Sequence, residues 1–147
     1  MSSELRQQSV QAFLDQLASA SPTPGGGSVA ALSGALAAGL ISMVCSLTVG
    51  RPRYADFDAH AQQILQQCES IRARLTDLID ADIAAYATVA AAYKRAKDDP
   101  ERAAAITVAM VQATDIPLQI AEQAAALLPL ALPVAQHGNR TAVGDVV

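Results

Sequence analysis

The chain has 147 residues, a net charge of −4 at pH 7 and only 3% aromatic residues. This length predicts one domain over residues 1–147 with its own core, and the acidic balance argues against a protein that binds nucleic acid through a basic face. Good helix formers dominate, and runs of β-branched residues are nearly missing. The composition therefore predicts an all-α fold, a multi-helical bundle.

A first helix is predicted from about Ser3 to Ser19, and residues 21–28 (SPTPGGGS) come directly after it. Two prolines and three consecutive glycines exclude a regular element and let another group approach the main chain. We expect Ser28 to N-cap the next helix. The segment is either a tight turn or a loop whose free N–H groups receive an anionic or carbonyl oxygen at a helix N-terminus.

A long helix of small residues is predicted over about 28–49, ended by Gly50 and Pro52. Val29–Val49 carries no charge and is long enough to cross a membrane. Alanine, glycine, serine and threonine dominate it, however, in place of large apolar residues. Because no second span is expected, we predict a fully buried central helix and no membrane interaction.

A second long helix is predicted over about 55–97. Its apolar residues alternate steps of three and four, as one buried helical face requires: Ile64, Cys68, Ile71, Leu75, Leu78, Ile79, Tyr86, Val89 and Tyr93. Asp82 falls on the centre line of this stripe, whereas Asp77 and Asp80 fall on the solvated side. A carboxylate there is either a general acid or base, or a structural group bonded to another helix's cap or to an arginine.

Residues 98–101 (DDPE) predict the start of a further helix that runs to about Leu128 with a kink at Pro117. Pro129 and Pro133 are expected to break the chain after this helix, and a short segment should end at His137 and Gly138. The chain stops at Val147 as an apolar pair would be entering another helix. We therefore expect the natural domain to continue beyond this point.

The remaining chemistry-bearing residues give weaker signals. Cys45 and Cys68 lie in apolar surroundings and are predicted to be buried free thiols. No Cys/His cluster has metal-ligand spacing, so no metal site is expected. The N-terminus is polar and lacks an apolar signal core, which predicts a cytoplasmic protein.

Several segments together resemble the cyclodeaminase/cyclohydrolase family of folate one-carbon enzymes, which includes the C-terminal domain of formiminotransferase-cyclodeaminase. The resemblance spans nearly the whole chain, and the PTPGGGS stretch at residues 22–28 is its most specific part. The later matching segments are weaker but occur in the family's order: residues 47–50 (LTVG), 78–82 (LIDAD), 116–118 (IPL), 138–140 (GNR) and 144–146 (GDV).

The resemblance implies an all-helical homodimer that binds folate in a cleft between helices, with tetrahydrofolate as substrate and no further cofactor. It implies hydrolysis of 5,10-methenyltetrahydrofolate to 10-formyltetrahydrofolate, deamination of 5-formiminotetrahydrofolate to the methenyl form, or both. Such an enzyme is a hydrolase or a lyase. The absence of a formiminotransferase domain in this sequence tilts the expectation slightly towards the cyclohydrolase.

The resemblance also implies roles for individual residues. Asp82 is the expected proton donor or acceptor, and Asp145 is the second catalytic carboxylate. The expected substrate-binding residues include the glycine loop and the arginines that would hold the anionic glutamate tail: Pro24, Gly25, Gly26, Gly27, Ser28, Tyr86, Asn139, Arg51 and Arg140.

Two alternatives stay open. In the first, the chain is a non-catalytic helical binding or assembly module, Asp82 is a structural buried acid and the glycine loop is only a turn. In the second, the chain is an enzyme that acts on another cationic or pterin-like substrate. A folate-sized cleft with Asp82, Tyr86 and the glycine loop would favour the folate enzyme over the module.

Overall fold

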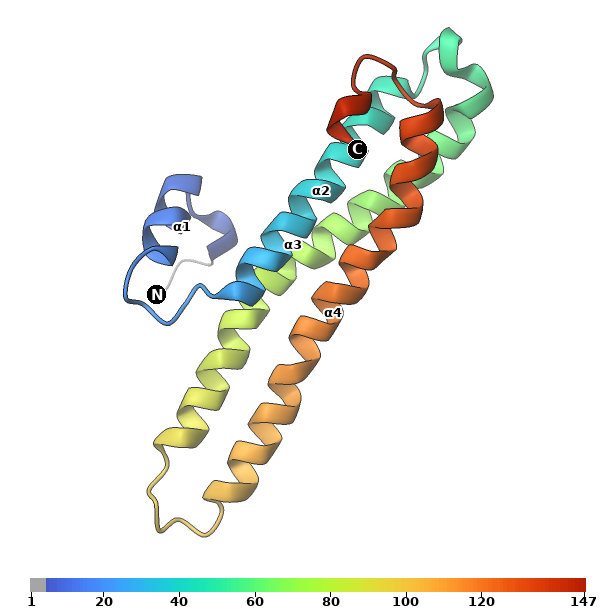
Figure 1. Ribbon diagram of the computed structural model, residues 1–147. Helices are drawn as coiled ribbons and strands as arrows, with labels where there is room; N and C mark the ends of the chain where they lie inside the picture. The colour runs from blue at the N-terminus through green and yellow to red at the C-terminus, as the bar shows by residue number, and fades with distance from the viewer. Residues whose placement is uncertain (1–4) are drawn as a thin grey trace. The chain divides into compact units, whose positions relative to one another are not determined.

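The computed structural model describes residues 5–147, and this part of the chain contains helices but no strand (Figure 1). The all-α prediction is confirmed. The chain forms two compact units: unit 1 comprises Met1–Ala31 and Thr76–Ala121, and unit 2 comprises Leu32–Leu75 and Glu122–Val147. Three long helices, α2 (Gly26–Thr48), α3 (Asp58–Lys94) and α4 (Arg102–His137), each run through both units.

The N-terminal part of unit 1 is not the single helix that the sequence predicted. A short 3₁₀ helix, η1 (Leu5–Gln7), precedes α1 (Val10–Leu17), and the expected start at Ser3 lies outside the described residues. Ser9 interrupts the helix because its side chain accepts a hydrogen bond from the Ala12 N–H at 3.1 Å and so caps α1.

Helix α2 begins at Gly26, two residues before the start expected at Ser28. Ser28 is therefore not the N-cap: it lies inside the first turn, and its hydroxyl points to α3. The prediction of a fully buried α2 is also wrong, since half of its most apolar stretch is buried. Helix α4 is a second helix long and apolar enough to cross a membrane, which removes one argument behind that prediction.

The predicted end of α2 is confirmed in unit 2. Gly50 adopts a φ of +73°, the left-handed conformation that favours glycine after a helix. Its N–H donates to Asp58 Oδ1 at 2.6 Å. A 3₁₀ helix, η2 (Pro52–Phe57), then leads into α3. The core of this unit holds several side chains with almost no exposed surface: Val44, Cys45, Ile64, Cys68, Leu75 and Val134.

The apolar stripe of α3 is buried over only part of its predicted length. Leu78 and Ile79 are buried in unit 1, but Tyr86 and Tyr93, expected on the same face, are 47% and 52% exposed. Beyond Asp82 the buried positions of unit 1 are mostly small, for example Ala92 and Ala109. Helices that pack through small residues leave longer side chains at the surface.

Helix α4 continues through Pro129 and Pro133, where the sequence predicted breaks. It runs from Arg102 to His137 and includes Pro117, Pro129 and Pro133. Each proline removes one N–H from the helix. The carbonyls left without a donor by Pro129 and Pro133 belong to exposed residues, so water can satisfy them. The chain then turns at Gly138 into η3 (Val143–Asp145).

Candidate active site

Asp82 in α3 binds the first turn of α2 within unit 1. Its Oδ2 accepts the Ser28 backbone N–H at 2.9 Å and lies 3.0 Å from the Ser28 Oγ. The same hydroxyl lies 3.1 Å from the carbonyl oxygen of Ile79. The carboxylate thus serves as an N-cap for a helix that begins more than 50 positions earlier in the chain, and the positive end of that helix favours its negative charge.

This arrangement corrects the expectation that Asp82 lies in the middle of a core face. Asp82 is half-buried. At this position the apolar face of α3 meets the first turn of α2, and the carboxylate binds the end of that helix. Bonding to another helix's cap was the structural interpretation considered above. The structure adds that the cap engages one carboxylate oxygen: Oδ1 accepts no hydrogen bond from any residue between 5 and 147.

Gly27 allows the carboxylate to come this close. A Cβ placed on Gly27 would lie 2.5 Å from the Asp82 Cγ and 2.9 Å from Oδ2, and would overlap Oδ1. A Cβ on Gly26 would meet nothing within 4 Å. The sequence predicted that the glycines let another group approach the main chain. The group that approaches Gly27 in this structure is the Asp82 side chain itself.

Oδ1 has no hydrogen-bond donor among residues 5–147 and lies against the main chain of Gly27, and this gives the site a defined chemistry. Oδ2 is held by the Ser28 N–H and hydroxyl, so the carboxylate cannot turn freely. A carboxylate fixed in this way accepts a proton at its other oxygen, returns it later, and stabilises a positive charge placed beside it. These are the functions expected of a general acid–base residue.

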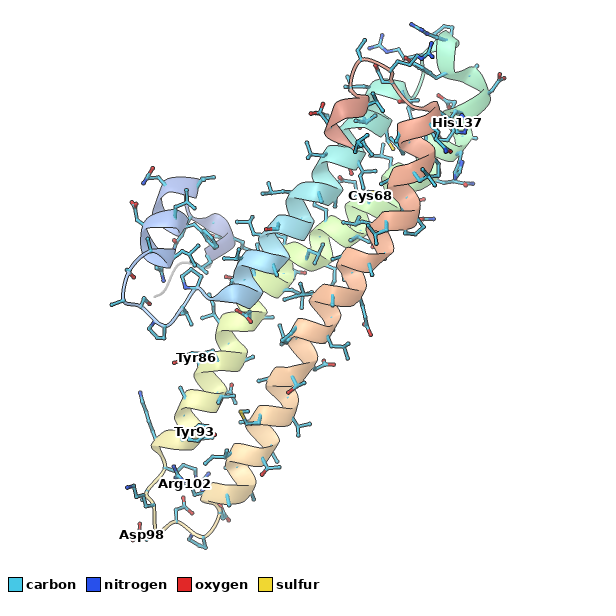
Figure 2. All side chains as sticks on the ribbon, viewed as in Figure 1. Cys68, Tyr86, Tyr93, Asp98, Arg102 and His137 are labelled. Atoms are coloured by element: carbon cyan, nitrogen blue, oxygen red, sulfur yellow. The ribbon has the colours of Figure 1, made fainter. Side chains whose placement is uncertain are left out.

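The other predicted residues of unit 1 lie close to Ser28 or Asp82 in the sequence. Tyr86 lies one turn further along α3, and Figure 2 shows its ring on the outside of that helix. Pro24 is buried, whereas Gly25 and Gly26 keep accessible surface. Ser28 itself is completely buried. Its side chain therefore lies behind Asp82 in this structure and has no surface of its own to offer to a ligand.

The sequence did not predict the role of Asp80, which was placed on the solvated side. Asp80 is half-buried, and its Oδ1 accepts the Leu5 N–H at 2.8 Å. Its Oδ2 lies 3.3 Å from the Arg6 Nε, and Arg6 also pairs with Asp77. These contacts hold the N-terminal segment against α3 next to Asp82. They join residues about 75 positions apart, and no local sequence pattern announces them.

The predicted residues of unit 2 form a separate group. The Asn139 N–H donates to Thr48 Oγ1 at 2.9 Å, and its Nδ2 donates to the Leu47 carbonyl oxygen at 3.1 Å. The Asn139 Oδ1 accepts hydrogen bonds from the N–H and hydroxyl of Thr141. Asn139 therefore ties the end of α4 to the end of α2, a structural function that the sequence did not suggest.

Three more predicted residues of unit 2 lie at its surface. Arg51 precedes η2, and Arg140 follows Asn139, where its backbone N–H donates to the Tyr54 hydroxyl at 3.2 Å. Asp145 ends η3 and is exposed. The roles assigned to these residues, binding of an anionic tail for the arginines and catalysis for Asp145, stay predictions.

The two cysteines are free and buried, as predicted. Burial raises the pKa of the Cys45 thiol to about 11 and that of the Cys68 thiol to about 12. Both thiols are therefore protonated near neutral pH and are poor nucleophiles and metal ligands. Within residues 5–147, no group of three or more His, Cys, Asp or Glu side chains is arranged to hold a metal ion.

An open hollow of about 610 Å³ lies in unit 1 between the last turns of α3 and the first turns of α4. Its lining begins at Thr88 and includes mainly alanines together with Arg95, Glu101 and Val108. The lining residues follow Tyr86 in the sequence, and Asp82 is not among them. This hollow is therefore not the cleft with Asp82, Tyr86 and the glycine loop that would favour a folate enzyme over a binding module.

Comparisons with known proteins agree with the resemblance described above. The family model described as formiminotransferase-cyclodeaminase matches residues 9–147. A methenyltetrahydrofolate cyclohydrolase from Methylorubrum extorquens is 42% identical over 142 residues, which cover 94% of this chain and 68% of that protein. A formimidoyltransferase-cyclodeaminase from Rattus norvegicus is 37% identical over 94% of this chain, but the match covers only 26% of that protein.

A solved structure shares the fold. The crystal structure of a formiminotetrahydrofolate cyclodeaminase from Thermotoga maritima matches with a TM-score of 0.86 at 29% sequence identity. The match covers 97% of this chain and 69% of that one.

Proposed function

Because this chain belongs to the formiminotransferase-cyclodeaminase family, we propose that it is a folate one-carbon enzyme with Asp82 as its acid–base residue. The observation that carries the assignment to Asp82 is the unequal environment of its two oxygens. Oδ2 is anchored to Ser28, and Oδ1 has no donor among residues 5–147. The substrate is 5,10-methenyltetrahydrofolate, 5-formiminotetrahydrofolate or both.

Hydrolysis of the methenyl form requires one proton acceptor that later becomes a donor. Water attacks the cationic carbon between N5 and N10, a C–O bond forms, and one water proton passes to the Asp82 carboxylate. The neutral adduct then opens: the bond from carbon to N5 breaks, Asp82 returns its proton to N5, and the adduct hydroxyl loses its proton to solvent. The products are 10-formyltetrahydrofolate and one proton, and Asp82 ends ionised.

Deamination of the formimino form uses the same group. The formimino group enters protonated, as a cationic amidinium. N10 attacks its carbon, Asp82 takes the proton that N10 loses, and the carboxylic acid passes that proton to the leaving amino group, whose bond to carbon then breaks. Ammonia departs and the cationic methenyl form remains. An ionised carboxylate beside that cation also stabilises it. One residue in one position therefore serves both reactions.

We favour hydrolysis as the main activity. The methenyltetrahydrofolate cyclohydrolase relative shares more identical residues with this chain and is covered over 68% of its length, against 26% for the bifunctional relative from rat. The structural similarity to the Thermotoga cyclodeaminase supports deamination as the second candidate. We propose a cytoplasmic enzyme with no cofactor beyond its tetrahydrofolate substrate.

We also propose a homodimer. Helix α2 carries no charged residue, yet part of it faces outward in unit 2. Its exposed large side chains repeat at helical spacing and form an apolar stripe: Leu36, Leu40, Met43 and Leu47. A second copy of the chain would cover this stripe with side chains of the same kind.

The test of the catalytic proposal is the loss of the 5,10-methenyltetrahydrofolate absorption band in the presence of the purified protein. Loss faster than in the protein-free blank is the expected result. Ammonia release from 5-formiminotetrahydrofolate, measured in parallel, decides whether the second reaction occurs. Failure to accelerate either reaction would contradict the assignment and favour the helical binding module.

A further inference from the structure

The buried hydroxyl of Ser28 faces two acceptors with a single hydrogen. Its Oγ lies 3.0 Å from Asp82 Oδ2 and 3.1 Å from the Ile79 carbonyl oxygen, and the residue is 0% exposed. A serine hydroxyl donates one hydrogen and accepts through its lone pairs. It can satisfy only one of these acceptors fully at a time, and water does not reach it to serve the other.

We propose that Ser28 is a positioning residue whose hydroxyl turns between Asp82 and Ile79 as the carboxyl group loses and regains its proton. The proposal rests on the proposed acid–base function of Asp82. When Asp82 is ionised, the hydroxyl donates to Oδ2, which carries part of the negative charge. When Asp82 is protonated, Oδ2 is a weaker acceptor and the hydroxyl donates to the Ile79 carbonyl.

The geometry explains why the buried hydroxyl is acceptable in both states. A buried hydrogen-bond donor without a partner destabilises the folded protein. Both acceptors of Ser28 lie at normal hydrogen-bond distances, so the donor has a partner whichever form Asp82 adopts. The hydroxyl changes its acceptor by rotation about the Cβ–Oγ bond of Ser28, and the backbone does not move. The proton can therefore arrive and leave without repacking of the helices.

The same contacts decide which carboxylate oxygen carries the proton. The Ser28 N–H donates to Oδ2 at 2.9 Å and cannot turn away, because it belongs to the backbone of α2. A proton on Oδ2 would weaken Oδ2 as the acceptor of the Ser28 N–H. Oδ1 accepts no hydrogen bond from residues 5–147, so a proton there disturbs no contact of this kind. Oδ1 is therefore the oxygen to which a water proton is transferred and from which N5 or the leaving nitrogen receives it. Oδ2 remains bound to Ser28 throughout.

The test is a Ser28→Ala variant, with Ser28→Thr as the variant that keeps a hydroxyl. Ser46→Ala is the matched control, since Ser46 lies on the same helix and its hydroxyl donates to the Ser42 carbonyl at 2.9 Å. Each protein is assayed with 5,10-methenyltetrahydrofolate for kcat and KM, and its thermal unfolding is followed by circular dichroism. The wild type is assayed first, because its inactivity would contradict the proposed function itself.

We expect Ser28→Ala to lower kcat by roughly 10-fold or more while KM changes little, since the loss affects proton transfer and not ligand contact. Ser28→Thr should recover most of the lost kcat, and Ser46→Ala should match the wild type. With an active wild type, an unchanged kcat in folded Ser28→Ala would overturn the proposal. A raised KM at unchanged kcat would overturn it as well, because it would assign the hydroxyl to substrate binding.

Discussion

Ser28 and Asp82 connect the start of α2 to the middle of α3 through two hydrogen bonds to one oxygen, at 2.9 Å from the backbone N–H and 3.0 Å from the hydroxyl. A helix is ordinarily capped by the residue that precedes it in the chain. Here the cap comes from another helix and is also the candidate acid–base residue. The proposed catalytic function therefore falls on a side chain that also stabilises the start of α2, and variants must separate the two effects.

Asp82→Asn separates them best. Asparagine keeps the size of the side chain and an oxygen that accepts the Ser28 N–H, but it does not take up a proton near neutral pH. We expect the fold to survive with a loss of about 1 kcal/mol or less in the free energy of unfolding. Turnover of 5,10-methenyltetrahydrofolate should fall by roughly 10²- to 10⁴-fold.

The control for this variant is Asp98→Asn, which makes the same change at an exposed loop position of unit 1 (Figure 2). Asp98→Asn should keep both the turnover and the unfolding temperature of the wild type. Undiminished turnover in Asp82→Asn would remove Asp82 from the mechanism.

A pair of adjacent glycines tests the approach of the carboxylate to the main chain. A Cβ at position 27 collides with the Asp82 carboxylate, whereas a Cβ at position 26 has open space. Gly27→Ala should therefore displace Asp82, weaken the cap by about 1 kcal/mol and lower kcat strongly. Gly26→Ala should be close to neutral in the free energy of unfolding, measured by urea titration, and the steady-state rate of Gly27→Ala is compared with that of the wild type. Equal behaviour of the two variants would show that the carboxylate does not need this space.

A second pair of glycines tests the turn after α2. Gly50 has a φ of +73° and Gly144 does not have a positive φ, while a Cβ added at either position would meet no atom within 4 Å. Any effect of alanine at position 50 thus comes from backbone conformation and not from a clash. We expect Gly50→Ala to lower the free energy of unfolding by roughly 1–2 kcal/mol. Gly144→Ala should have an effect within about 0.5 kcal/mol, and a similar loss in both variants would contradict the argument.

Some of this structure follows from local sequence patterns. Gly50 before Pro52 predicts the end of α2, and the spacing of Ile64, Cys68 and Leu75 predicts the buried side of α3. These features depend on residues within a few turns of one another. The order of the family's motifs also indicated the family before any contact was known.

The contacts that build the candidate site do not follow from such patterns. Asp82 meets Ser28 across 54 positions and Asp80 meets Leu5 across 75, so only the packing of the helices brings them together. Asp82 and Asp80 were separated by helical periodicity into a core and a solvated residue, yet both are half-buried. Pro129 and Pro133 of α4 failed as break signals because the carbonyls that they leave without a donor belong to exposed residues, where water can satisfy them.

The buried thiols give a prediction that is independent of activity. Burial raises the pKa of Cys45 to about 11 and that of Cys68 to about 12, so the reactive thiolate is scarce at pH 8. A chromogenic disulfide reagent at pH 8 should react very slowly with the folded protein and rapidly with both thiols in guanidinium chloride. Rapid reaction of either cysteine in the folded protein would contradict the burial of these side chains.

The apolar stripe on α2 makes the proposed dimer testable by a single charge. Leu40 is 42% exposed and lies between Leu36 and Met43 on a helix without charged residues. A glutamate at this position would place an unpaired charge in the interface of two copies, which is strongly unfavourable. We expect the wild type to sediment as a dimer and Leu40→Glu to sediment as a monomer that keeps its helical circular dichroism.

The control for this variant is Ala73→Glu. Ala73 is exposed between two arginines of α3, so the glutamate should leave the dimer intact. A wild type that sediments as a monomer would contradict the proposal, and a wild type that instead floats with lipid vesicles would assign the stripe to a membrane surface.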